Sequence, residues 1–276
     1  MVALVTGASS GMGYDTARAL ALKGFTVYAA ARRVALMEPL REYGVTPVAL
    51  DLTSSESIAA CLDAVGDVDI LVNNAGYGYF GPLECVSMEE ARRQLEVNLF
   101  GLAELCKAVL PSMRARGSGR IVNVGSVAGH ACMNFGGWYN VSKFAVRAFT
   151  DSLRMEMQPF GVSVVLVEPG GVKTGWGDIA ADHLSECVAG TAYEEPASRQ
   201  AAAMHKCYSL NLLSSPAVVS RAIVRAVCAR RPRTHYRPGR GAGSIVFWHA
   251  VLPDRWWDAL MRRLGSRRLA KLAEKL

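Results

Sequence analysis

The chain has 276 residues, 51% of them hydrophobic, which is enough to bury the core of one large α/β domain. Its seven cysteines form no CxxC pair, and the opening MVALVTGAS has neither a charged leader nor a cleavage site; these features argue against a disulfide framework, a zinc site and secretion, and predict a cytoplasmic protein. The net charge of +7 comes from residues 230–276, with 12 Lys and Arg against 3 Asp and Glu, so any argument from charge concerns the tail.

Short β-branched runs alternate with longer helical stretches along the chain. Strands are predicted at 2–6, 26–30, 47–51, 69–73, 120–124 and 162–167, and helices at 11–23, 35–43, 54–64, 87–115, 138–158 and 216–230. Most strands are continuous apolar runs, as expected when both faces of a parallel sheet are covered. The pattern predicts a single-domain α/β fold, a Rossmann-like doubly wound parallel sheet in three α/β/α layers, with a C-terminal helical extension.

Three parts of the chain differ in composition and periodicity. Residues 1–240 are predicted to form a catalytic domain that holds both the cofactor and the substrate sites. Within it, 175–215 has many small residues and weak periodicity, which suggests a mobile lid. Residues 241–276 are predicted to be a basic helical extension, in which apolar and cationic residues alternate at helical spacing.

The extension admits three interpretations. Its charges and tryptophans suit an anionic membrane surface. It also suits packing on the body or on a second subunit, with the charges left in water, which is the favoured interpretation. Nucleic-acid binding is set aside because no base-reading module accompanies the basic residues. The longest apolar run, which starts at Ser244, is too short to span a bilayer.

The segment TGASSGMG, residues 6–13, follows the first strand and opens the first helix. Glycines at 7, 11 and 13 permit a tight turn and let backbone N–H groups approach a pyrophosphate at the helix N-terminus. The other predicted cofactor contacts in this loop are Ser9, Ser10 and Met12. A dinucleotide site is favoured over an ordinary turn because the loop lies at a strand–turn–helix junction.

The end of the second strand, VYAAARR, indicates which dinucleotide is bound. Ala31 stands where an NAD site usually has an acidic residue, and Arg32 and Arg33 follow it. An arginine pairs with a 2′-phosphate that a carboxylate would repel, so NADP(H) is predicted. Asp51, near the end of the third strand, is a candidate for the adenine amino group, although it equally suits the cap of the following helix. Leu52 beside it is a further predicted contact.

With TGASSGMG, LVNNAG (71–76), NVGS (123–126), YNVSK (139–143) and PGGVKT (169–174) in this order, the chain resembles the short-chain dehydrogenase/reductase family over residues 1–236. The resemblance implies that Tyr139 is the acid/base and that Lys143 lowers its pKa. Ser126 holds the substrate oxygen, and Asn98 supports a water linked to the lysine. A tyrosine and a lysine four residues apart project from one helix face, which suits this interpretation.

The resemblance also implies further cofactor contacts. The residues Asn73, Asn74, Ala75 and Gly76 would border the cofactor, with Asn73 chiefly tying strands together. The nicotinamide end would be held by Pro169, Gly170, Val172 and Thr174, and Tyr139 and Lys143 would adjoin the same end. Five scattered histidines show no ligand spacing, so no metal is predicted. His130 is interpreted as a loop histidine. Phe135 and Trp138 could either line an apolar substrate pocket or pack in the core.

The predicted function is NADP(H)-dependent interconversion of a secondary alcohol and a ketone. The substrate would be a small apolar alcohol or ketone, and the chain looks closest to the hydroxysteroid and retinol dehydrogenase branch, with a steroid or bile acid as first choice. The alternatives are a retinol or other apolar-carbonyl reductase, a ketoacyl-carrier reductase, and an NADP(H)-sensing binding protein. A homo-oligomer, either dimer or tetramer, is expected.

Overall fold

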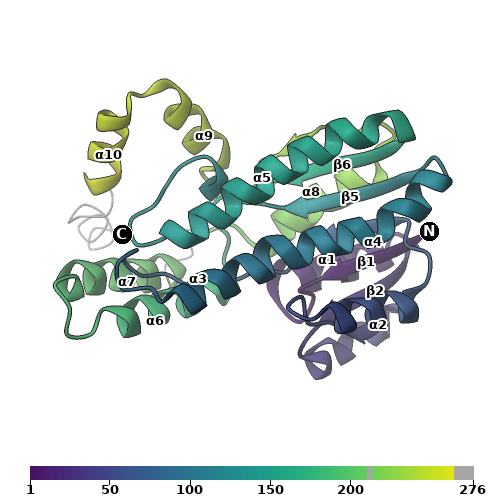
Figure 1. Cartoon of the computed structure of the whole chain (residues 1–276), viewed down its shortest axis with the longest axis horizontal. Coiled ribbons are helices and arrows are strands. Elements are labelled where there is room, and N and C mark those ends of the chain that lie inside the picture. The colour runs from purple at the N-terminus through teal and green to yellow at the C-terminus, as the bar shows by residue number, and fades with distance from the viewer. Residues whose placement is uncertain (210–212, 264–276) are drawn as a thin grey trace.

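The computed structural model describes residues 1–209 and 213–263, and its centre is one parallel sheet (Figure 1). The seven strands run in the order β3-β2-β1-β4-β5-β6-β7, and all neighbours are parallel. Their bounds are Val2–Thr6 (β1), Thr26–Ala31 (β2), Thr46–Ala49 (β3), Ile70–Asn73 (β4), Gly119–Val124 (β5), Val162–Val167 (β6) and His235–Tyr236 (β7). The predicted Rossmann-like architecture is therefore confirmed.

Helices cover both faces of the sheet. On one face, α1 (Gly11–Ala21), α8 (Pro216–Cys228) and the 3₁₀ helix η1 (Val34–Tyr43) share a buried apolar cluster with the strands. On the other face, α2 (Ser55–Val65), α4 (Gly101–Ala115) and α5 (Gly137–Met157) share a second cluster. Strands such as VSVVLV are buried on both faces, which explains why apolar residues run through them without alternation.

The remaining helices lie beyond the carboxyl ends of the strands. In Figure 1, α6 (Trp176–Val188) with α7 (Glu194–Ser209), and α9 (Ala242–Val251) with α10 (Asp254–Arg263), form two separate lobes on either side of the start of α5. A third apolar cluster, which includes Phe80 and Tyr139, fills the space beside α6 and α7. No helix among the described residues is long and apolar enough to cross a membrane.

Several predicted elements differ from the observed ones. The third strand ends at Ala49, so Asp51 lies in the loop that follows it. The 35–43 helix is a 3₁₀ helix, and Pro39 lies inside it. The helix predicted over 87–115 is interrupted: α3 (Met88–Leu95) leads into a π-turn, η2 (Glu96–Phe100), before α4 begins. The segment predicted as a lid contains α6 and α7, and the short strand β7 was missed. Residues 264–276 of the predicted extension lie outside the described residues.

The order of the strands locates a crevice. β1 lies between β2 and β4, so the chain crosses from β1 toward β2 in one direction and later toward β4 in the other. In open α/β sheets, ligands bind outside the carboxyl ends of the strands at such a point of reversal. The glycine loop that follows β1 and residues 74–76, which follow β4, meet there.

Candidate active site

The glycine loop packs directly on the segment after β4. At Gly7, where φ is +66°, a Cβ would lie 2.7 Å from Ala75 Cα, and at Gly13 a Cβ would lie 2.4 Å from Gly7 O. Side chains at these two positions would push the loop away from the sheet. The turn therefore requires glycine for both its backbone conformation and its close approach.

Two polar side chains hold this turn in place and leave the start of α1 open. Thr6 Oγ1 accepts hydrogen bonds from the backbone N–H groups of Asn74 and Ala75, each at 3.1 Å. The Asn74 side chain in turn donates to Thr6 O at 2.9 Å. Ser10, the N-cap of α1, makes no side-chain cap bond. The first N–H groups of the helix are thus available to an anion.

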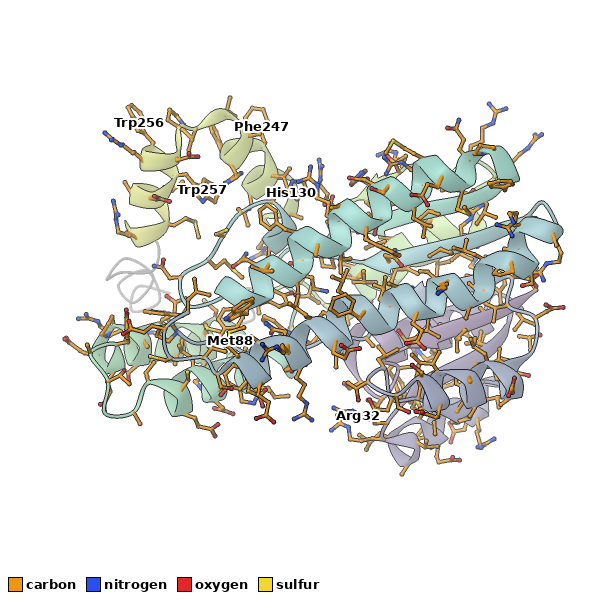
Figure 2. All side chains as sticks on the ribbon, viewed as in Figure 1. Arg32, Met88, His130, Phe247, Trp256 and Trp257 are labelled. Atoms are coloured by element: carbon orange, nitrogen blue, oxygen red, sulfur yellow. The ribbon has the colours of Figure 1, made fainter. Side chains whose placement is uncertain are left out.

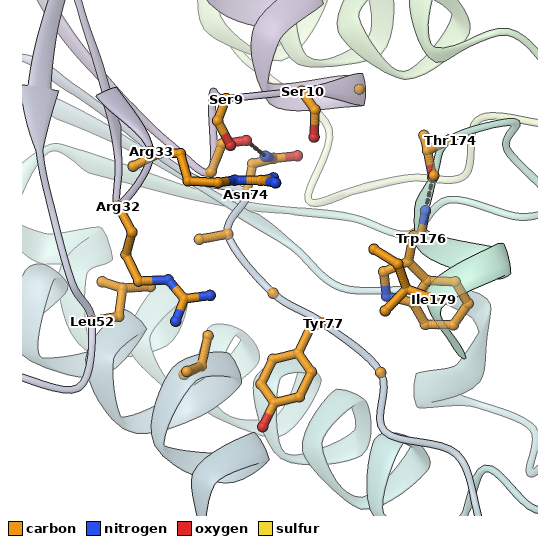
Figure 3. Close-up of a pocket in the computed structure, with 18 of the residues that line it drawn as sticks. Ser9, Ser10, Arg32, Arg33, Leu52, Asn74, Tyr77, Thr174, Trp176 and Ile179 are labelled. Atoms are coloured by element: carbon orange, nitrogen blue, oxygen red, sulfur yellow. Dashed lines mark hydrogen bonds between the residues drawn. The ribbon is translucent and has the colours of Figure 1, made fainter. Parts of the chain in front are cut away.

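A cleft of about 790 Å³ opens at this point of the sheet. Figure 3 shows Arg32 and Leu52 on one side of it, and Trp176 with Ile179 on the other. Thirteen residues predicted to contact the cofactor line it: Gly7, Ser9, Ser10, Gly11, Met12, Arg32, Arg33, Asp51, Leu52, Asn74, Ala75, Gly76 and Thr174. The sequence patterns thus converge on one cavity.

Positive charge gathers at the end of the cleft near β2. Arg32 and Arg33 are exposed there, and α3 adds Arg93, which sequence reasoning missed. The pKa of Asp51 is lowered, chiefly by the hydrogen bond from the Thr53 N–H and further by the charges of Arg32 and Arg93. Arg32 and Arg93 thus both contribute, after the hydrogen bonds from Thr53, to keeping this carboxylate ionised.

Asp51 is not the cap of the following helix. Ser54 is the N-cap of α2, and its side chain accepts a hydrogen bond from Ser57 N. Asp51 instead accepts hydrogen bonds from the backbone and the hydroxyl of Thr53, at 3.0 and 2.8 Å. The capping alternative is therefore wrong, and the carboxylate lies at the cleft wall.

The tyrosine and the lysine of YNVSK are both buried on α5, one helical turn apart. Lys143 Nζ lies 5.9 Å from the centroid of the Tyr139 ring and donates to Val124 O at 3.0 Å. Burial lowers the pKa of Lys143 from 10.5 to about 8. The carbonyl at the end of β5 thus anchors the amine beside the phenol ring.

The two other residues of the predicted catalytic group are Ser126 and Asn98. Ser126 Oγ accepts a hydrogen bond from Ala128 N at 3.1 Å, which fixes the side chain and leaves its O–H proton available to an oxygen atom. Asn98 lies in the π-turn, and its amide accepts from Tyr77 N at 3.0 Å and donates to Tyr77 O at 2.9 Å. π-turns of this kind are frequent at functional sites.

Gly76 separates this group from the cleft. A Cβ at Gly76 would lie 3.0 Å from Asn98 Oδ1 and 3.7 Å from Lys143 Nζ. Because Gly76 lines the cleft, Asn98 and Lys143 lie immediately behind its wall. Asn98, Ser126, Tyr139 and Lys143 do not themselves line the cavity.

Trp176 covers the tyrosine on the cleft side. Its ring centroid lies 4.9 Å from that of Tyr139 and 5.7 Å from that of Phe80. Trp176 is the first residue of α6, directly after the Thr174–Gly175 segment, and it lines the cleft. Sequence reasoning missed this residue, which both lines the cavity and contacts the ring of the predicted acid/base.

Three residues lining the cleft carry buried polar atoms that have no hydrogen-bond partner among the described residues. They are Asn74 Oδ1, Tyr77 OH and His183 Nδ1. Burial raises the pKa of Tyr77 to about 12, so this phenol remains a neutral donor. Buried polar atoms in native proteins almost always find a partner. The wall of the cleft therefore contains three buried polar atoms whose partners are not among the described residues.

Other predicted contacts lie beside the cleft rather than on its wall: Gly13, Asn73, Pro169, Gly170 and Val172. The Asn73 side chain donates to Asn123 Oδ1 at 3.0 Å and so ties β4 to β5. Pro169 O accepts from Val127 N at 3.1 Å, which fastens the loop after β6 to the loop that carries Ser126. Phe135 packs in the third apolar cluster, and neither it nor Trp138 lines the cleft.

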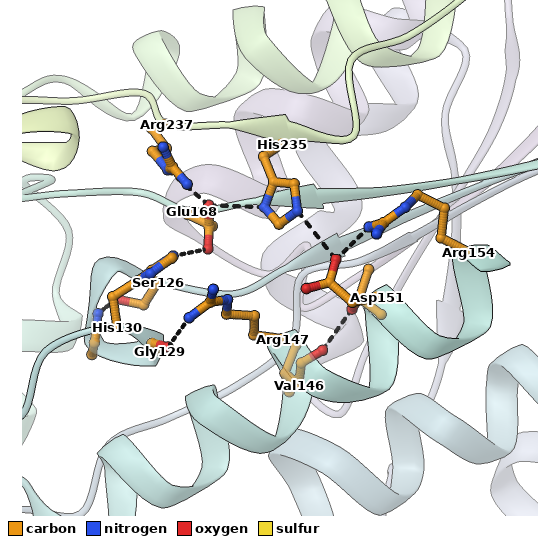
Figure 4. A network of polar contacts seen from close by, with 12 residues as sticks. Ser126, Gly129, His130, Val146, Arg147, Asp151, Arg154, Glu168, His235 and Arg237 are labelled. Atoms are coloured by element: carbon orange, nitrogen blue, oxygen red, sulfur yellow. Dashed lines mark hydrogen bonds and ion pairs between the residues drawn. The ribbon is translucent and has the colours of Figure 1, made fainter. Parts of the chain in front are cut away.

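A buried carboxylate network stands behind the Ser126 loop (Figure 4). Glu168, at the end of β6, binds His130 Nε2 at 2.5 Å, His235 Nδ1 at 3.2 Å and Arg237 Nε at 3.1 Å. Burial alone would raise the pKa of Glu168, but hydrogen bonds from His235 and His130 hold it at about 2. Burial lowers the pKa of His130. His130 thus joins its loop to the sheet and does not face the cleft.

Among the described residues there is no group of three or more His, Cys, Asp or Glu side chains arranged to hold a metal ion. The features that fit a ligand are instead those of a dinucleotide site: a glycine cradle without room for Cβ atoms, open N–H groups at α1, and arginines at the end of β2. Fold and cleft together are those of a Rossmann-type oxidoreductase.

Comparison with known proteins agrees with this class. A family model described as short chain dehydrogenase matches residues 1–185. The bovine 17-beta-hydroxysteroid dehydrogenase type 6 is 36% identical, with 94% of this chain and 87% of that protein covered. Bovine retinol dehydrogenase 8 is 35% identical, with 91% of this chain and 85% of that protein covered. The chain belongs to the short-chain dehydrogenase/reductase family.

A solved structure that contains a bound cofactor shares this fold. The crystal structure of a short chain dehydrogenase from Burkholderia cenocepacia in complex with NADP matches with a TM-score of 0.72 and 28% identity. The match covers 96% of this chain and 98% of the other. The fold of the whole described body is thus that of a family enzyme.

Proposed function

We propose that this protein uses NADP(H) to interconvert an apolar secondary alcohol and its ketone, with a hydroxysteroid as the first candidate. The observation that carries the proposal is the buried amine of Lys143, 5.9 Å from the ring of Tyr139 and directly behind the cleft wall at Gly76. An ammonium stabilises a neighbouring phenolate, which brings proton exchange by a tyrosine within reach of neutral pH.

The chain's own residues would carry the proton and hold the substrate. In the direction of reduction, Tyr139 gives its proton to the carbonyl oxygen while Ser126 donates a hydrogen bond to the same oxygen. In oxidation, the phenolate takes the proton back. Asn98 holds the Tyr77 segment and Val124 O holds the lysine, so the charge beside Tyr139 does not have to reorganise during the reaction.

The proposed cofactor fits the cleft. The N-terminus of α1 would take the pyrophosphate, and Arg32, aided by Arg33, would take the 2′-phosphate. The nicotinamide supplies or accepts the hydride when bound. Thr174, which lines the cleft, with Pro169, Gly170 and Val172 behind it, would support the nicotinamide end.

The surroundings of Tyr139 support an apolar substrate. Phe80, Ala180, Leu184 and partly buried Trp176 and Met204 belong to the cluster that packs around it. Two full-length relatives are named for a hydroxysteroid and for retinol, both largely apolar alcohols. A large apolar ring system gains most from such surroundings because its whole surface leaves water.

Replacing Tyr139 with Phe tests the proton step. We expect turnover of a ketosteroid to fall by roughly 10²- to 10⁴-fold, because the proton donor is lost, whereas NADPH still binds. NADPH absorbance measures turnover, and fluorescence titration measures binding. The matched control is Tyr43→Phe, because Tyr43 is an exposed tyrosine outside the cleft. Unchanged turnover in Tyr139→Phe would refute the proposed mechanism, whereas an unchanged biological output of this variant would favour the cofactor-sensing role.

Replacing Arg32 with Ala tests the choice of cofactor. We expect kcat/KM for NADPH to fall by about tenfold or more, since a charge-assisted pairing is lost, while the value for NADH hardly changes. Arg41→Ala is the control, because Arg41 is exposed nearby and does not line the cleft. An equal or better rate of the unmodified protein with NADH would overturn the NADP(H) assignment.

We also propose that the protein forms a homo-oligomer. The outer surfaces of η2 and α5 expose the apolar side chains of Phe100, Val141 and Phe144. Such side chains at neighbouring positions suit a contact between copies, which burial would stabilise. Light scattering of the purified protein would report the number of subunits, and a monomer at all concentrations would contradict this proposal.

A further inference from the structure

The lobe made of α9 and α10, residues 242–263, exposes an unusual amount of apolar surface. α9 contains no Asp, Glu, Lys or Arg, yet Ala242 is its one buried residue. Phe247 and Trp248 of α9 are 60% and 51% exposed, and Trp256 of α10 is 70% exposed. A helix with so few polar residues normally lies inside a protein or a lipid phase.

Two of these exposed rings lie on the outer side of the lobe. Figure 2 shows Phe247 and Trp256 at its outer edge, whereas Trp257 lies between the two helices. Trp257 is 6% exposed, and its ring meets that of His249 edge to face, with centroids 5.1 Å apart. The lobe thus has a packed inner side and an apolar outer side.

The excess positive charge of the chain lies in the same part of the sequence as this apolar surface. Residues 230–276 hold 12 Lys and Arg against 3 Asp and Glu, whereas the whole chain has 31 against 24. The part of the chain before residue 230 therefore carries no excess of positive charge. Among the described residues, Arg237 and Arg240 precede α9, and Arg255 and Arg262 lie on α10. Aromatic rings that enter a headgroup region beside cations are the pattern of a helix that lies on an anionic bilayer.

We propose that the α9–α10 lobe docks this protein on an anionic lipid bilayer, with Phe247, Trp248 and Trp256 entering the interface. The ten residues of α9 are too few to cross a bilayer, so the helices lie on the surface. A second copy of the chain would also cover the rings, but it would bring another strongly basic segment to the same place. Charge therefore favours the lipid.

The segment that leads into the lobe is hydrogen-bonded to the Gly170–Gly171 loop, which the proposed function places at the nicotinamide end of the cleft. Gly170 N donates to Pro238 O at 2.9 Å, and Gly171 N donates to Arg240 O at 3.2 Å. A Cβ at Gly170 would lie 2.5 Å from Arg240 O, so the two segments are in close contact. Docking would hold this loop beside the bilayer. If the proposed function holds, an apolar alcohol could pass from the lipid to the site without crossing water.

The test uses the full chain and vesicles without substrate. Sedimentation is measured with vesicles of phosphatidylcholine alone and with about one third phosphatidylserine. We expect binding to the anionic vesicles, weakened by high salt. The variant Trp248→Ser/Trp256→Ser should bind at least about tenfold more weakly. Leu22→Ser/Met155→Ser is the matched control, since these residues are 68% and 64% exposed elsewhere, and it should bind like the parent.

Three results would overturn the proposal. They are no binding to anionic vesicles, equal binding of the double tryptophan variant, and a vesicle-free dimer that this variant dissociates, which would show that a second copy covers the lobe. Turnover of a soluble ketone with NADPH is measured separately, without vesicles. A failure of the docking proposal and a failure of the proposed activity are thus distinguishable.

Discussion

Lys143 is a buried titratable residue whose charge depends on pH near neutrality. Its amine is surrounded by protein and has the carbonyl of Val124 as hydrogen-bond acceptor. Burial disfavours the ammonium, and the pKa falls to about 8. Below that pH the charge is present beside the ring of Tyr139, and above it the charge is lost. The proposed assistance to the phenolate should therefore decline above pH 8.

Lys143→Met should separate stability from activity. Between pH 8 and 10.5 the unfolded chain holds the lysine proton and the folded protein does not, so the unfolding free energy of the parent rises with pH in this window. The methionine variant lacks this rise. We expect its stability relative to the parent to fall by about 1–3 kcal/mol between pH 7 and pH 10, and its turnover to fall by roughly 10²-fold or more. Denaturant titrations at both pH values measure the first effect. A constant difference would show that the pKa of Lys143 is not lowered.

Some residues of the site could be predicted because their role is local. Gly7 and Gly13 are required by a turn of eight residues, and the spacing of Tyr139 and Lys143 by one helical turn. Trp176 and Arg93 could not be predicted, because they reach the cleft from helices whose placement depends on packing between distant segments. The roles of the catalytic group stay predictions until the variants are measured.

At the scale of elements, Glu168 joins three segments that contain no common sequence pattern. The end of β6, the loop with His130 and the short strand β7 meet at this carboxylate. His235 of β7 also contacts Asp151 of α5 at 3.1 Å. A two-residue strand has too little pattern to be recognised, so its position depends on these contacts and on its pairing with β6.

Glu168→Gln should destabilise the protein. Removing one member of a buried charged network costs about 3–5 kcal/mol. The folded pKa of Glu168 is about 2 against an ordinary 4.5, so its contribution is complete above pH 4.5 and is lost as the pH falls toward 2. The difference between parent and variant should therefore be largest at neutral pH and shrink in acid. Denaturant titration across this range measures it, and Glu186→Gln, at an exposed site, is the control.

The helices α6 and α7 escaped prediction for a physical reason. Their buried positions are largely alanine, such as Ala180, Ala181, Ala197 and Ala201, which let two helices approach closely but give a weak hydrophobic period. The π-turn was likewise hidden. Gly101 follows the π-turn, and a Cβ added at this residue would lie 2.4 Å from Leu52 O. Such a contact between distant segments cannot be inferred from sequence periodicity.

At the scale of the whole molecule, the alternation of strands and helices was sufficient to predict the fold, because burial on both faces of a parallel sheet leaves long apolar runs. The division at residue 240 stays a prediction. We expect a chain ending at Gly241, which retains β7 and the Arg240 carbonyl, to keep NADPH-dependent turnover of a soluble ketone within about twofold, since α9 buries so little. Turnover and thermal melting measure this. A loss of cofactor binding would show that the lobe belongs to the catalytic fold.

The packing of α1 against α8 has a consequence for how the chain is made. Ala17 and Leu20 of α1 share a buried cluster with Val219 and Ile223 of α8. The ribosome delivers α1 near the start of synthesis and α8 close to its end, whereas the residues that line the cleft all lie between Gly7 and His183. A nascent chain thus contains every residue of the cleft while the part of this face that α8 covers is still exposed. A chain stalled before residue 216 would present that side to chaperones.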